Sequence, residues 1–372
     1  MNKKNECSLE QRPLVALIYG GNSLEAEVSI KSGKNVSGGL DRNRIEVYEV
    51  FLRGDCWRVL NPSGDAVEEG LAEAILAEAE EMEKKFNTGL GRLKAEYMSN
   101  KIGVDVDKND FSFTYNGKKK KFDAAYIMIH GNPGENGLLQ GYLEMMNVPF
   151  NTCSSFVSSI TFDKHSCKRF LDFAGIKLAK DVFLRKWGTS DCQYDTKDIV
   201  AKLGLPLFVK PTDGGSSFGV TKVKREEDLE AAITFAFKES HSVIIEECIS
   251  GREMTNGIYR KGDMMVKLPV TEIVTDREFF DYEAKYLGQS KEICPAEISD
   301  NLSSRIQDLS EQIYKYLGCS GLVRMDYIVR GEDIYFLEIN TVPGMTAMSL
   351  VPAQVRVAKI DMTEFLHAAL GL

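Results

Sequence analysis

The sequence predicts an α/β protein with several domains. Apolar segments of strand length alternate with segments of helical pattern, and turns rich in glycine connect them. A chain of 372 residues is long enough for two or three domains, each with a core of its own. Hydrophobic residues make up 43% of the chain and charged residues 27%, which is typical of a protein that folds in water.

Two predicted strands near the end of the chain carry the strongest functional signal. Residues 322–329 and 334–340 are rich in β-branched and apolar side chains, and Gly331-Glu332-Asp333 separates them. Side chains two positions apart lie on the same face of a strand. The pattern therefore predicts a hairpin with two different faces.

One face of this hairpin is polar. Arg324 and Asp326 share a face of the first strand, and Glu338 and Asn340 share a face of the second. If the strands pair antiparallel, these side chains converge, and their oxygen atoms and guanidinium suit Mg²⁺ and a phosphate. A surface hairpin with an internal salt bridge is the alternative interpretation. The alternating neighbours are expected to face the core: Val323, Met325, Leu337 and Ile339.

Charge and composition exclude several classes of protein. The net charge of −9 argues against general nucleic-acid binding, although an acidic protein can hold a locally basic site. No apolar run is long enough to span a bilayer, and the polar start does not resemble a signal peptide. The eight cysteines and four histidines show no metal-binding spacing, which favours reduced thiols in a cytoplasmic protein.

The first domain is predicted to begin with a strand, a glycine turn and a helix. Residues 13–20 form the strand, Gly21-Asn22-Ser23 form the turn, and Glu25 lies in the first turn of the helix. The turn is not a GxGxxG fingerprint, so a dinucleotide site is not supported. A structural cap and a binding site are equally compatible with Glu25. Residues 45–52 are predicted as the second strand.

Residues 61–121 show a less regular pattern. Within them, residues 68–99 are predicted as an acidic amphipathic helix that is interrupted at Asn87-Thr88-Gly89. Residues 111–122 are predicted as a hairpin, because Asn116-Gly117 is a strong signal for a tight turn between strands.

Two glycine-rich loops follow predicted strands. The first starts at His130, after residues 122–129, and leads into a helix from Leu138. Ligands bind at the carboxyl ends of such strands, so His130 is a candidate, although a lone histidine is more often structural. The second is PTDGGSSFGVTKV, which follows a strand ending on Lys210. Its amides and lysine suit phosphate groups, but it lacks the Walker pattern, and a surface hairpin is the alternative.

The second half of the chain holds further predicted elements. Helices are expected at 158–175, 198–204, 226–238 and 303–317, strands at 205–210, at 242–246 and from Glu253, and a polar loop at 276–290. Long loops inside compact domains are usually functional.

Five motifs occur in one order along the chain. They are GGNSLEAEVS, HGNPGENGLLQG, VKPTDGGSSFGV, FFDYEAKY and RMDY…LEINTVPGMTAMSLVP. Together they resemble the D-alanine–D-alanine ligases of the ATP-grasp superfamily, and the resemblance covers most of residues 13–352. Residues 61–121 contain no matching motif and resemble an elaboration of the first domain.

The resemblance implies a Rossmann-like N-terminal α/β domain followed by a two-part ATP-grasp domain. The implied boundaries are 1–152 for the first domain, 153–249 for a central ATP-binding lid, and 250–372 for a C-terminal domain with the metal and substrate sites. ATP is expected to lie between the last two.

The resemblance also implies a reaction. ATP drives the joining of two D-alanines through a D-alanyl phosphate, for peptidoglycan precursors, with two Mg²⁺ ions that Mn²⁺ can replace. The expected protein is a cytoplasmic homodimer. The alternatives are a ligase that uses D-lactate or D-serine as second substrate, and an idle paralogue that only binds nucleotide.

The resemblance assigns a role to individual residues. Those expected to act in catalysis are Glu25, Ser216, Tyr286, Arg324 and Gly344. Those expected to bind D-alanine are His130, Ser349 and Leu350. Those expected to bind ATP are Lys164, Lys210, Ser217, Glu246, Glu247, Ile249, Glu253 and Lys285. The expected metal ligands are Asp326, Glu338 and Asn340.

Departures from the family pattern are small. Asn136 replaces the aspartate that is usual in the first glycine-rich loop, and Asn22 stands where threonine is common. The DYEAKY motif with Tyr286 is intact. Relatives that make D-alanyl-D-lactate tend to differ at this loop, so the motif favours an amine as second substrate.

Overall fold

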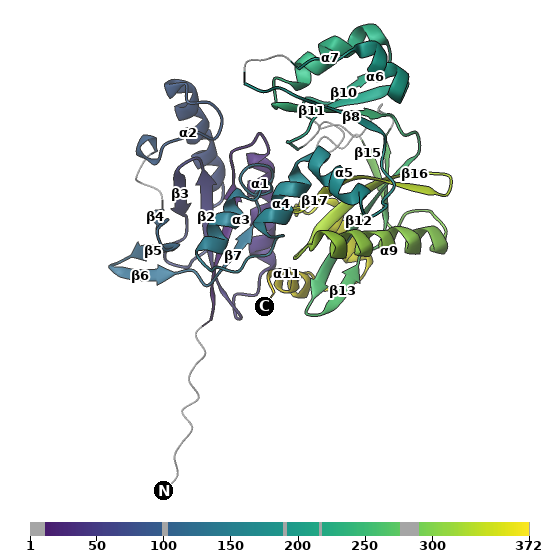
Figure 1. Ribbon diagram of the computed structural model, residues 1–372. Coiled ribbons are helices and arrows are strands. Elements are labelled where there is room, and N and C mark those ends of the chain that lie inside the picture. The colour runs from purple at the N-terminus through teal and green to yellow at the C-terminus, as the bar shows by residue number, and fades with distance from the viewer. Residues whose placement is uncertain (1–11, 99–102, 189–191, 216–217, 276–289, 372) are drawn as a thin grey trace.

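The computed structural model describes residues 12–98, 103–188, 192–215, 218–275 and 290–371, and these form three β-sheets flanked by helices (Figure 1). The N-terminal sheet lies on one side of the molecule. A small sheet lies above a larger C-terminal one on the other side. This arrangement agrees with the α/β class predicted from the sequence.

The N-terminal sheet has seven strands in the order β6-β5-β4-β3-β2-β1-β7. The pairings β1–β2 and β1–β7 are parallel, and the other described strands extend the sheet antiparallel. The predicted turn at Asn116 and Gly117 is confirmed, because both residues have positive φ angles, 49° and 72°. The strands are β1 (Leu14–Gly20), β2 (Glu46–Arg53), β3 (Cys56–Val59), β4 (Val104–Asp107), β5 (Ser112–Tyr115), β6 (Lys118–Lys121) and β7 (Ala124–Ile127).

Three helices accompany this sheet, namely α1 (Ala26–Gly39), α2 (Leu71–Phe86) and α3 (Leu138–Met145). The helix predicted within residues 68–99 and its interruption at Asn87 are confirmed, but the helical pattern does not resume as an α-helix after the interruption. Helix α2 ends at Phe86 because Asn87 adopts a left-handed conformation with φ 49°. Beyond it, the only described helical element before residue 99 is a 3₁₀ turn, Ala95–Tyr97.

The single helix predicted at residues 158–175 is wrong. Two helices occupy this region, α4 (Ser155–Phe162) and α5 (Lys164–Asp172). Asp163 interrupts the helical backbone with φ −87° and ψ 107°, and its carboxylate accepts a hydrogen bond from the Ser166 amide. The aspartate thus caps the second helix, so Lys164 lies at a helix start rather than inside a helix.

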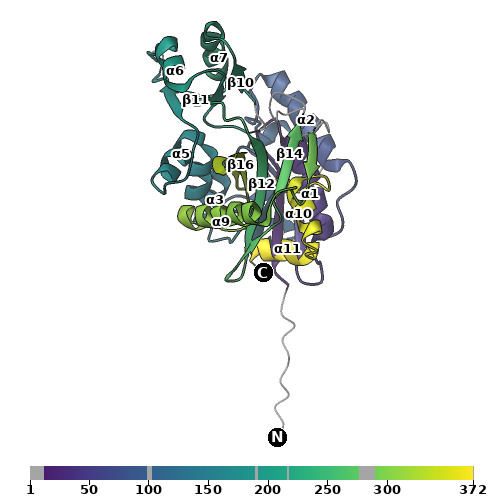
Figure 2. The same cartoon turned by 90° about the vertical axis from the view of Figure 1, so that its right-hand side faces the viewer.

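A four-stranded antiparallel sheet follows, in the order β10-β9-β11-β8. Its apolar face packs against two helices to form a separate small core. Figure 2 shows this unit above the larger C-terminal sheet. The elements are β8 (Asp181–Arg185), α6 (Thr196–Leu203), β9 (Leu207–Pro211), β10 (Thr221–Val223), α7 (Leu229–Ala236) and β11 (Ser242–Glu247).

The C-terminal sheet is antiparallel, with the order β15-β14-β12-β16-β17 and β13 paired to β12. Its strands are β12 (Arg252–Lys261), β13 (Met264–Lys267), β14 (Thr271–Thr275), β15 (Ser290–Ile293), β16 (Val323–Arg330) and β17 (Asp333–Asn340). Its helices are α9 (Asp300–Leu317), α10 (Leu350–Val357) and α11 (Met362–Leu370). No described helix is both long and apolar enough to cross a membrane.

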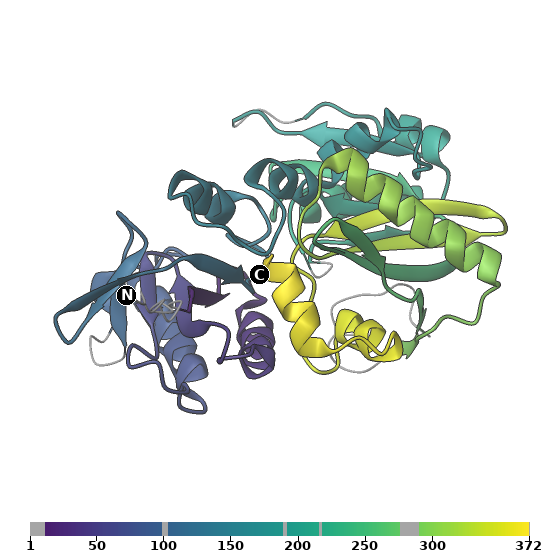
Figure 3. The ribbon, with the colours of Figure 1, turned by 90° about the horizontal axis from the view of Figure 1, so that it is seen from below.

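The hydrophobic cores join segments that lie far apart in the sequence. Helices α10 and α11 contribute Val351 and Phe365 to the core that also contains Tyr19 and Val36 of the N-terminal domain. Figure 3 shows these last two helices between the N-terminal domain and the C-terminal sheet. Side chains of α4 and α5 share a core with β12 and β16. Helices α10 and α11 therefore pack against the N-terminal domain, and helices α4 and α5 pack against the C-terminal sheet.

Gly33 provides a test of how closely α1 packs on the first sheet. A Cβ atom at this position would lie 2.3 Å from Cδ1 of the buried Tyr19. We expect Gly33→Ala to lower the free energy of unfolding by about 1–3 kcal/mol, measured by urea denaturation, because the core cannot accept the methyl group. Gly38→Ala, in the same helix with nothing within 4 Å, is the control and should stabilise by about 0.5–1 kcal/mol.

Candidate active site

The polar hairpin forms as the sequence predicted. Strands β16 and β17 pair antiparallel, with Arg324 opposite Asn340 and Asp326 opposite Glu338. The four side chains therefore lie on one face at the same end of the hairpin. Of the neighbours expected in the core, three are buried: Val323, Met325 and Ile339.

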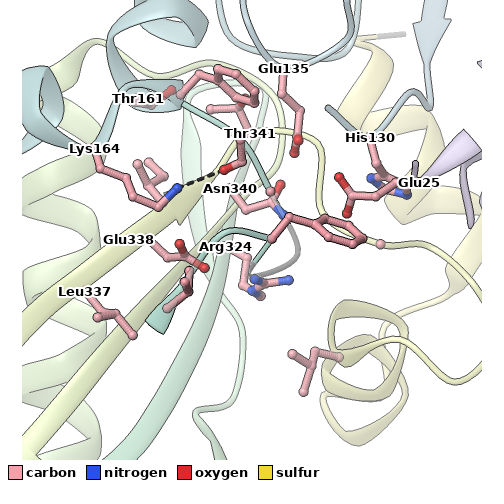
Figure 4. A pocket seen from close by; sticks show the side chains of 18 of the residues that line it. Glu25, His130, Glu135, Thr161, Lys164, Arg324, Leu337, Glu338, Asn340 and Thr341 are labelled. Atoms are coloured by element: carbon pink, nitrogen blue, oxygen red, sulfur yellow. Dashed lines mark hydrogen bonds between the residues drawn. The ribbon is translucent and has the colours of Figure 1, made fainter. Parts of the chain in front are cut away.

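The expectation for Leu337 is wrong. The register shifts after Asp326, so that Tyr327 pairs with Phe336 and Leu337 has no partner across the ladder. Such a β-bulge turns a side chain away from the face that simple alternation predicts. Leu337 consequently lines the cavity described next, beside the polar residues (Figure 4).

A cavity of about 1050 Å³ lies where the N-terminal domain, the small sheet and the C-terminal sheet meet. Figure 4 shows Glu25 and His130 near each other in this cavity, and Glu338 and Lys164 farther along it. The structure thus brings together residues that are more than 300 positions apart. The sequence-predicted residues that line it are Glu25, His130, Lys164, Lys210, Glu246, Glu247, Ile249, Glu253, Arg324, Glu338, Asn340, Gly344, Ser349 and Leu350.

The remaining predicted residues do not line the cavity or cannot be placed. Asp326 is 4% exposed and lies behind Arg324, which donates hydrogen bonds of 2.9 and 2.8 Å to its two carboxylate oxygens. Thr255 donates a third, of 2.6 Å. Four predicted residues lie outside the described part of the chain: Ser216, Ser217, Lys285 and Tyr286.

His130 connects the N-terminal domain to the C-terminal sheet. Its Nδ1 lies 2.9 Å from the Val342 carbonyl oxygen and its Nε2 lies 3.1 Å from Ser32 Oγ. Because a carbonyl only accepts, Nδ1 must carry the proton. Burial lowers the pKa of His130, with Glu25 and the Val342 carbonyl acting against it and Arg324 adding to it. A neutral imidazole therefore faces the cavity near Glu25.

The side of the cavity near the small sheet holds a buried chain of charges. Lys210 Nζ lies 2.7 Å from one carboxylate oxygen of Glu246, and Lys168 contacts the other. Burial alone would raise the pKa of Glu246, but the two lysines lower it to about 2. Lys168 also pairs with Asp181 at 3.1 Å. Sequence reasoning did not single out Lys168, because its pattern is that of an ordinary amphipathic helix.

The glycine hairpin of the small sheet reaches across to the first domain. Lys164 Nζ donates a 2.8 Å hydrogen bond to the Gly214 carbonyl. A Cβ atom on Gly215 would lie only 2.7 Å from Glu25 Oε2. The Gly214–Gly215 part of this loop therefore lies close to the carboxylate of Glu25, at the end of the cavity that holds Glu25.

The loop after β17 closes another wall. Ser349 Oγ lies 3.0 Å from the Thr346 amide and accepts its hydrogen bond. A Cβ atom on Gly344 would lie 2.9 Å from Ser349 Oγ, so Gly344 leaves room for that side chain. Asn35 of α1 donates a 2.6 Å hydrogen bond to the Met345 carbonyl. Helix α1 thus holds this loop against the N-terminal domain.

Glu135 is a cavity residue to which sequence reasoning assigned no role. It lies within the HGNPGENG loop, and its Oε2 accepts a 2.7 Å hydrogen bond from the Gly131 amide. Burial and the nearby Glu25 raise its pKa to about 8. The sequence contained a signal for Glu135, because it is an acid inside the glycine-rich loop that begins at the candidate residue His130.

Fold and site together define an ATP-grasp protein, in which two antiparallel sheets enclose a nucleotide-sized cavity beside an α/β domain. Residues 14–153 match the family model described as the D-ala D-ala ligase N-terminus, and residues 170–370 match the D-ala D-ala ligase C-terminus. The chain therefore belongs to the D-alanine–D-alanine ligase family.

Individual relatives agree with this assignment. The chain is 42% identical over 351 residues to the D-alanine–D-alanine ligase of Phocaeicola vulgatus, covering 94% of this chain and 96% of the relative. The solved VanG D-Ala:D-Ser ligase from Enterococcus faecalis is 31% identical, with a TM-score of 0.79 over 97% of this chain and 99% of that one. The D-alanine–D-alanine ligase from Bacillus anthracis complexed with ATP is 27% identical, with a TM-score of 0.68 over 96% of each chain.

Glu135 predicts a characteristic dependence of stability on pH. Its pKa of about 8 in the folded chain exceeds its ordinary value of 4.5, so between these pH values only the folded chain keeps the proton. Folding stability should therefore fall as the pH rises from 4.5 to 8. We expect Glu135→Gln, which can still accept the Gly131 hydrogen bond, to remove more than about 1 kcal/mol of this decline in urea titrations without ligand. Parallel curves for the variant and the parent would contradict the assignment.

Proposed function

We propose that this chain uses ATP to join two molecules of D-alanine, releasing ADP and phosphate. The observation that carries the proposal is the single cavity in which Glu25 and His130 meet Lys210 and the Arg324–Asn340 end of the hairpin. It offers anionic and cationic groups at separate positions, as two zwitterionic substrates and a triphosphate require. The family relationship supports the same reaction.

The first step activates one D-alanine. Glu25 binds its ammonium group, and the carboxylate attacks the γ-phosphorus of ATP to give an acyl phosphate and ADP. Lys164 and Lys210 hold the phosphates, while Glu246, Glu247, Ile249 and Glu253 surround the adenosine. The ion pair of Lys210 with Glu246 keeps that lysine charged and in place before ATP arrives.

The second step forms the peptide bond. Ser349 and the Leu350 amide hold the carboxylate of the second D-alanine, whose amine attacks the acyl carbon. Arg324 and the Gly344 amide stabilise the negative oxygen of the tetrahedral intermediate. Phosphate then leaves. Glu25 is 7% exposed and the glycine hairpin passes over it, which helps to exclude water from the acyl phosphate.

The residues outside the described part of the chain complete this proposal. Ser216 and Tyr286 would hydrogen-bond with Glu25 and close loops over the substrates. Ser217 and Lys285 would contact ATP. Their placement rests on the family resemblance.

The carboxylates of the hairpin suit a divalent metal. Asp326 and Glu338 face each other across the strands, and Asn340 adds an amide oxygen, which is the hard oxygen set that Mg²⁺ prefers. No three acidic, histidine or cysteine side chains gather into a metal site within the described residues, so ATP phosphates would complete the coordination. Two Mg²⁺ ions, or Mn²⁺ in their place, would neutralise charge on the phosphates. Arg324 would have to release part of Asp326 for this residue to serve as a ligand.

A second candidate function is a ligase with a different second substrate. The structural similarity to a D-Ala:D-Ser ligase favours considering D-serine, and D-lactate is the further option. The intact DYEAKY motif supports D-alanine, since an amine is the expected nucleophile.

We also propose that the protein is a cytoplasmic homodimer. ATP as substrate and the free state of the described cysteines support the location. The dimer rests on the family resemblance alone.

The reaction is tested by offering D-alanine, L-alanine, D-serine and D-lactate in turn with Mg²⁺ and ATP. We expect phosphate release only when D-alanine is present, and a product with the mass of D-alanyl-D-alanine. A higher rate with a mixture of D-alanine and D-serine or D-lactate, with the mixed product, would establish the second candidate. ATP binding without phosphate release in any mixture would favour a paralogue that only binds nucleotide.

Glu338→Gln tests the metal site. We expect the Mg²⁺ concentration for half-maximal rate to rise roughly tenfold or more, because a neutral amide binds the cation more weakly than a carboxylate. Glu332→Gln is the control, since Glu332 lies in the turn of the same hairpin with a side chain that is 91% exposed. An unchanged Mg²⁺ requirement in Glu338→Gln would remove this residue from the metal site.

A further inference from the structure

Arg53 is a fully buried arginine outside the cavity, and the proposed reaction does not use it. It lies on β2 with 0% exposure. Its Nε and Nη2 donate hydrogen bonds of 2.9 Å each to the two carboxylate oxygens of Glu83. A buried ion pair is costly to form, and it is weak evidence for stability by itself. The second group that Arg53 contacts suggests a more specific role.

The second partner of Arg53 belongs to the loop that carries Glu25. Arg53 Nη1 donates a 3.1 Å hydrogen bond to the carbonyl of Gly21, which has a φ angle of +101°. The next residue, Asn22, accepts a 2.7 Å hydrogen bond from the Gly54 amide. Arg53 of β2 and the next residue, Gly54, thus each form a hydrogen bond with the Gly21–Asn22 turn.

Further hydrogen bonds connect this turn to Glu25 and to the loop that begins at His130. Ser23 Oγ donates a 2.8 Å hydrogen bond to the His130 carbonyl and accepts one of 3.2 Å from the Glu25 amide. The Asn22 amide also donates to the Asn132 carbonyl, at 2.7 Å. The positions of Glu25 and of the His130 loop therefore both depend on this turn.

Glu83 links this network to the part of the N-terminal domain that contains none of the five sequence motifs. It lies on α2, within residues 61–121. Besides Arg53, its Oε1 accepts a 3.1 Å hydrogen bond from the Gly91 amide. A Cβ atom on Gly91 would lie 2.3 Å from Asn22 Cβ, so the segment after α2 packs directly on the turn.

We infer that α2 and the segment after it act as a brace, which means that they hold the first D-alanine site in position. Arg53 is the positioning residue that connects this brace to the turn before Glu25. This rests on the proposed function. The guanidinium is held by both oxygens of Glu83, and this fixes its Nη1 toward Gly21. A planar group with several donors can satisfy both partners at once, whereas a lysine ammonium on a flexible stem cannot reproduce that geometry.

The test uses a double variant, Arg53→Met with Glu83→Leu, in the full chain. Removing one partner leaves an uncompensated buried charge and destabilises the fold, whereas replacing both by apolar residues of similar size is often neutral. We expect a thermal midpoint close to that of the parent. The KM for the first D-alanine should rise roughly tenfold, because one charge-assisted hydrogen bond to the turn is lost. The KM for ATP and the kcat at saturation should stay within about twofold, because Arg53 touches neither the ATP groups nor Arg324.

The first site is measured separately by titrating D-alanine into enzyme saturated with a non-hydrolysable ATP analogue. The matched control is Arg58→Met, a buried arginine of β3 that pairs with Asp105. It should lower stability without weakening the first D-alanine. A double variant that folds and binds the first D-alanine like the parent would overturn the inference. If the double variant does not fold, Arg53→Lys decides, since unchanged D-alanine affinity there would overturn the inference and weakened affinity would support it.

Failure of the proposed function is distinguishable from failure of this inference. If the parent enzyme makes no D-alanyl-D-alanine, the proposed function is wrong, whatever the variants show. If the parent makes it and the double variant has normal KM values, only the inferred brace is wrong.

Discussion

The pairing of buried charges determines the architecture around the cavity. Arg324 holds both oxygens of Asp326, and Lys210 and Lys168 hold Glu246. A charge in a protein interior is tolerated only when it is paired and hydrogen-bonded. Arg324 and Asp326 lie on one face of β16, whereas Lys210 and Lys168 connect Glu246 on β11 to β9 and to α5. The same contacts that make burial tolerable therefore set the relative positions of the strands and helices that form the site.

Glu135 is a buried acid that stays neutral instead of forming an ion pair. It has the Gly131 amide as donor, and the charged residue with the largest effect on its pKa is another acid, Glu25. Its pKa rises to about 8, so the carboxyl group stays neutral at neutral pH instead of being paired. Two acids that line the cavity thus differ, because two lysines lower the pKa of Glu246 whereas burial and Glu25 raise the pKa of Glu135. An incoming ammonium or metal ion would change that balance.

Local sequence patterns predicted the elements well where one pattern dominated. The β16–β17 hairpin, the Asn116-Gly117 turn and the strands β1 and β2 follow from period-two alternation and turn residues. Errors arose where a single side chain or one extra residue changed the course of the backbone. Asp163 caps a new helix where apolar spacing alone predicted continuity, and the bulge at Leu337 reversed its face. Neither effect appears in the periodicity of the chain, because both depend on hydrogen bonds that form only in the fold.

The sequence by itself determined the class of the protein, because five motifs with distinct chemistry occur in a single order. Many of the residues that it predicted for the site line one cavity. The tertiary structure decided which side chains are neighbours. The role of Lys168, the proton on Glu135 and the contact of Arg53 with Gly21 depend on burial and on partners that are distant in the sequence. A motif records which groups are available, whereas desolvation and distance, which act only in three dimensions, determine what those groups can do.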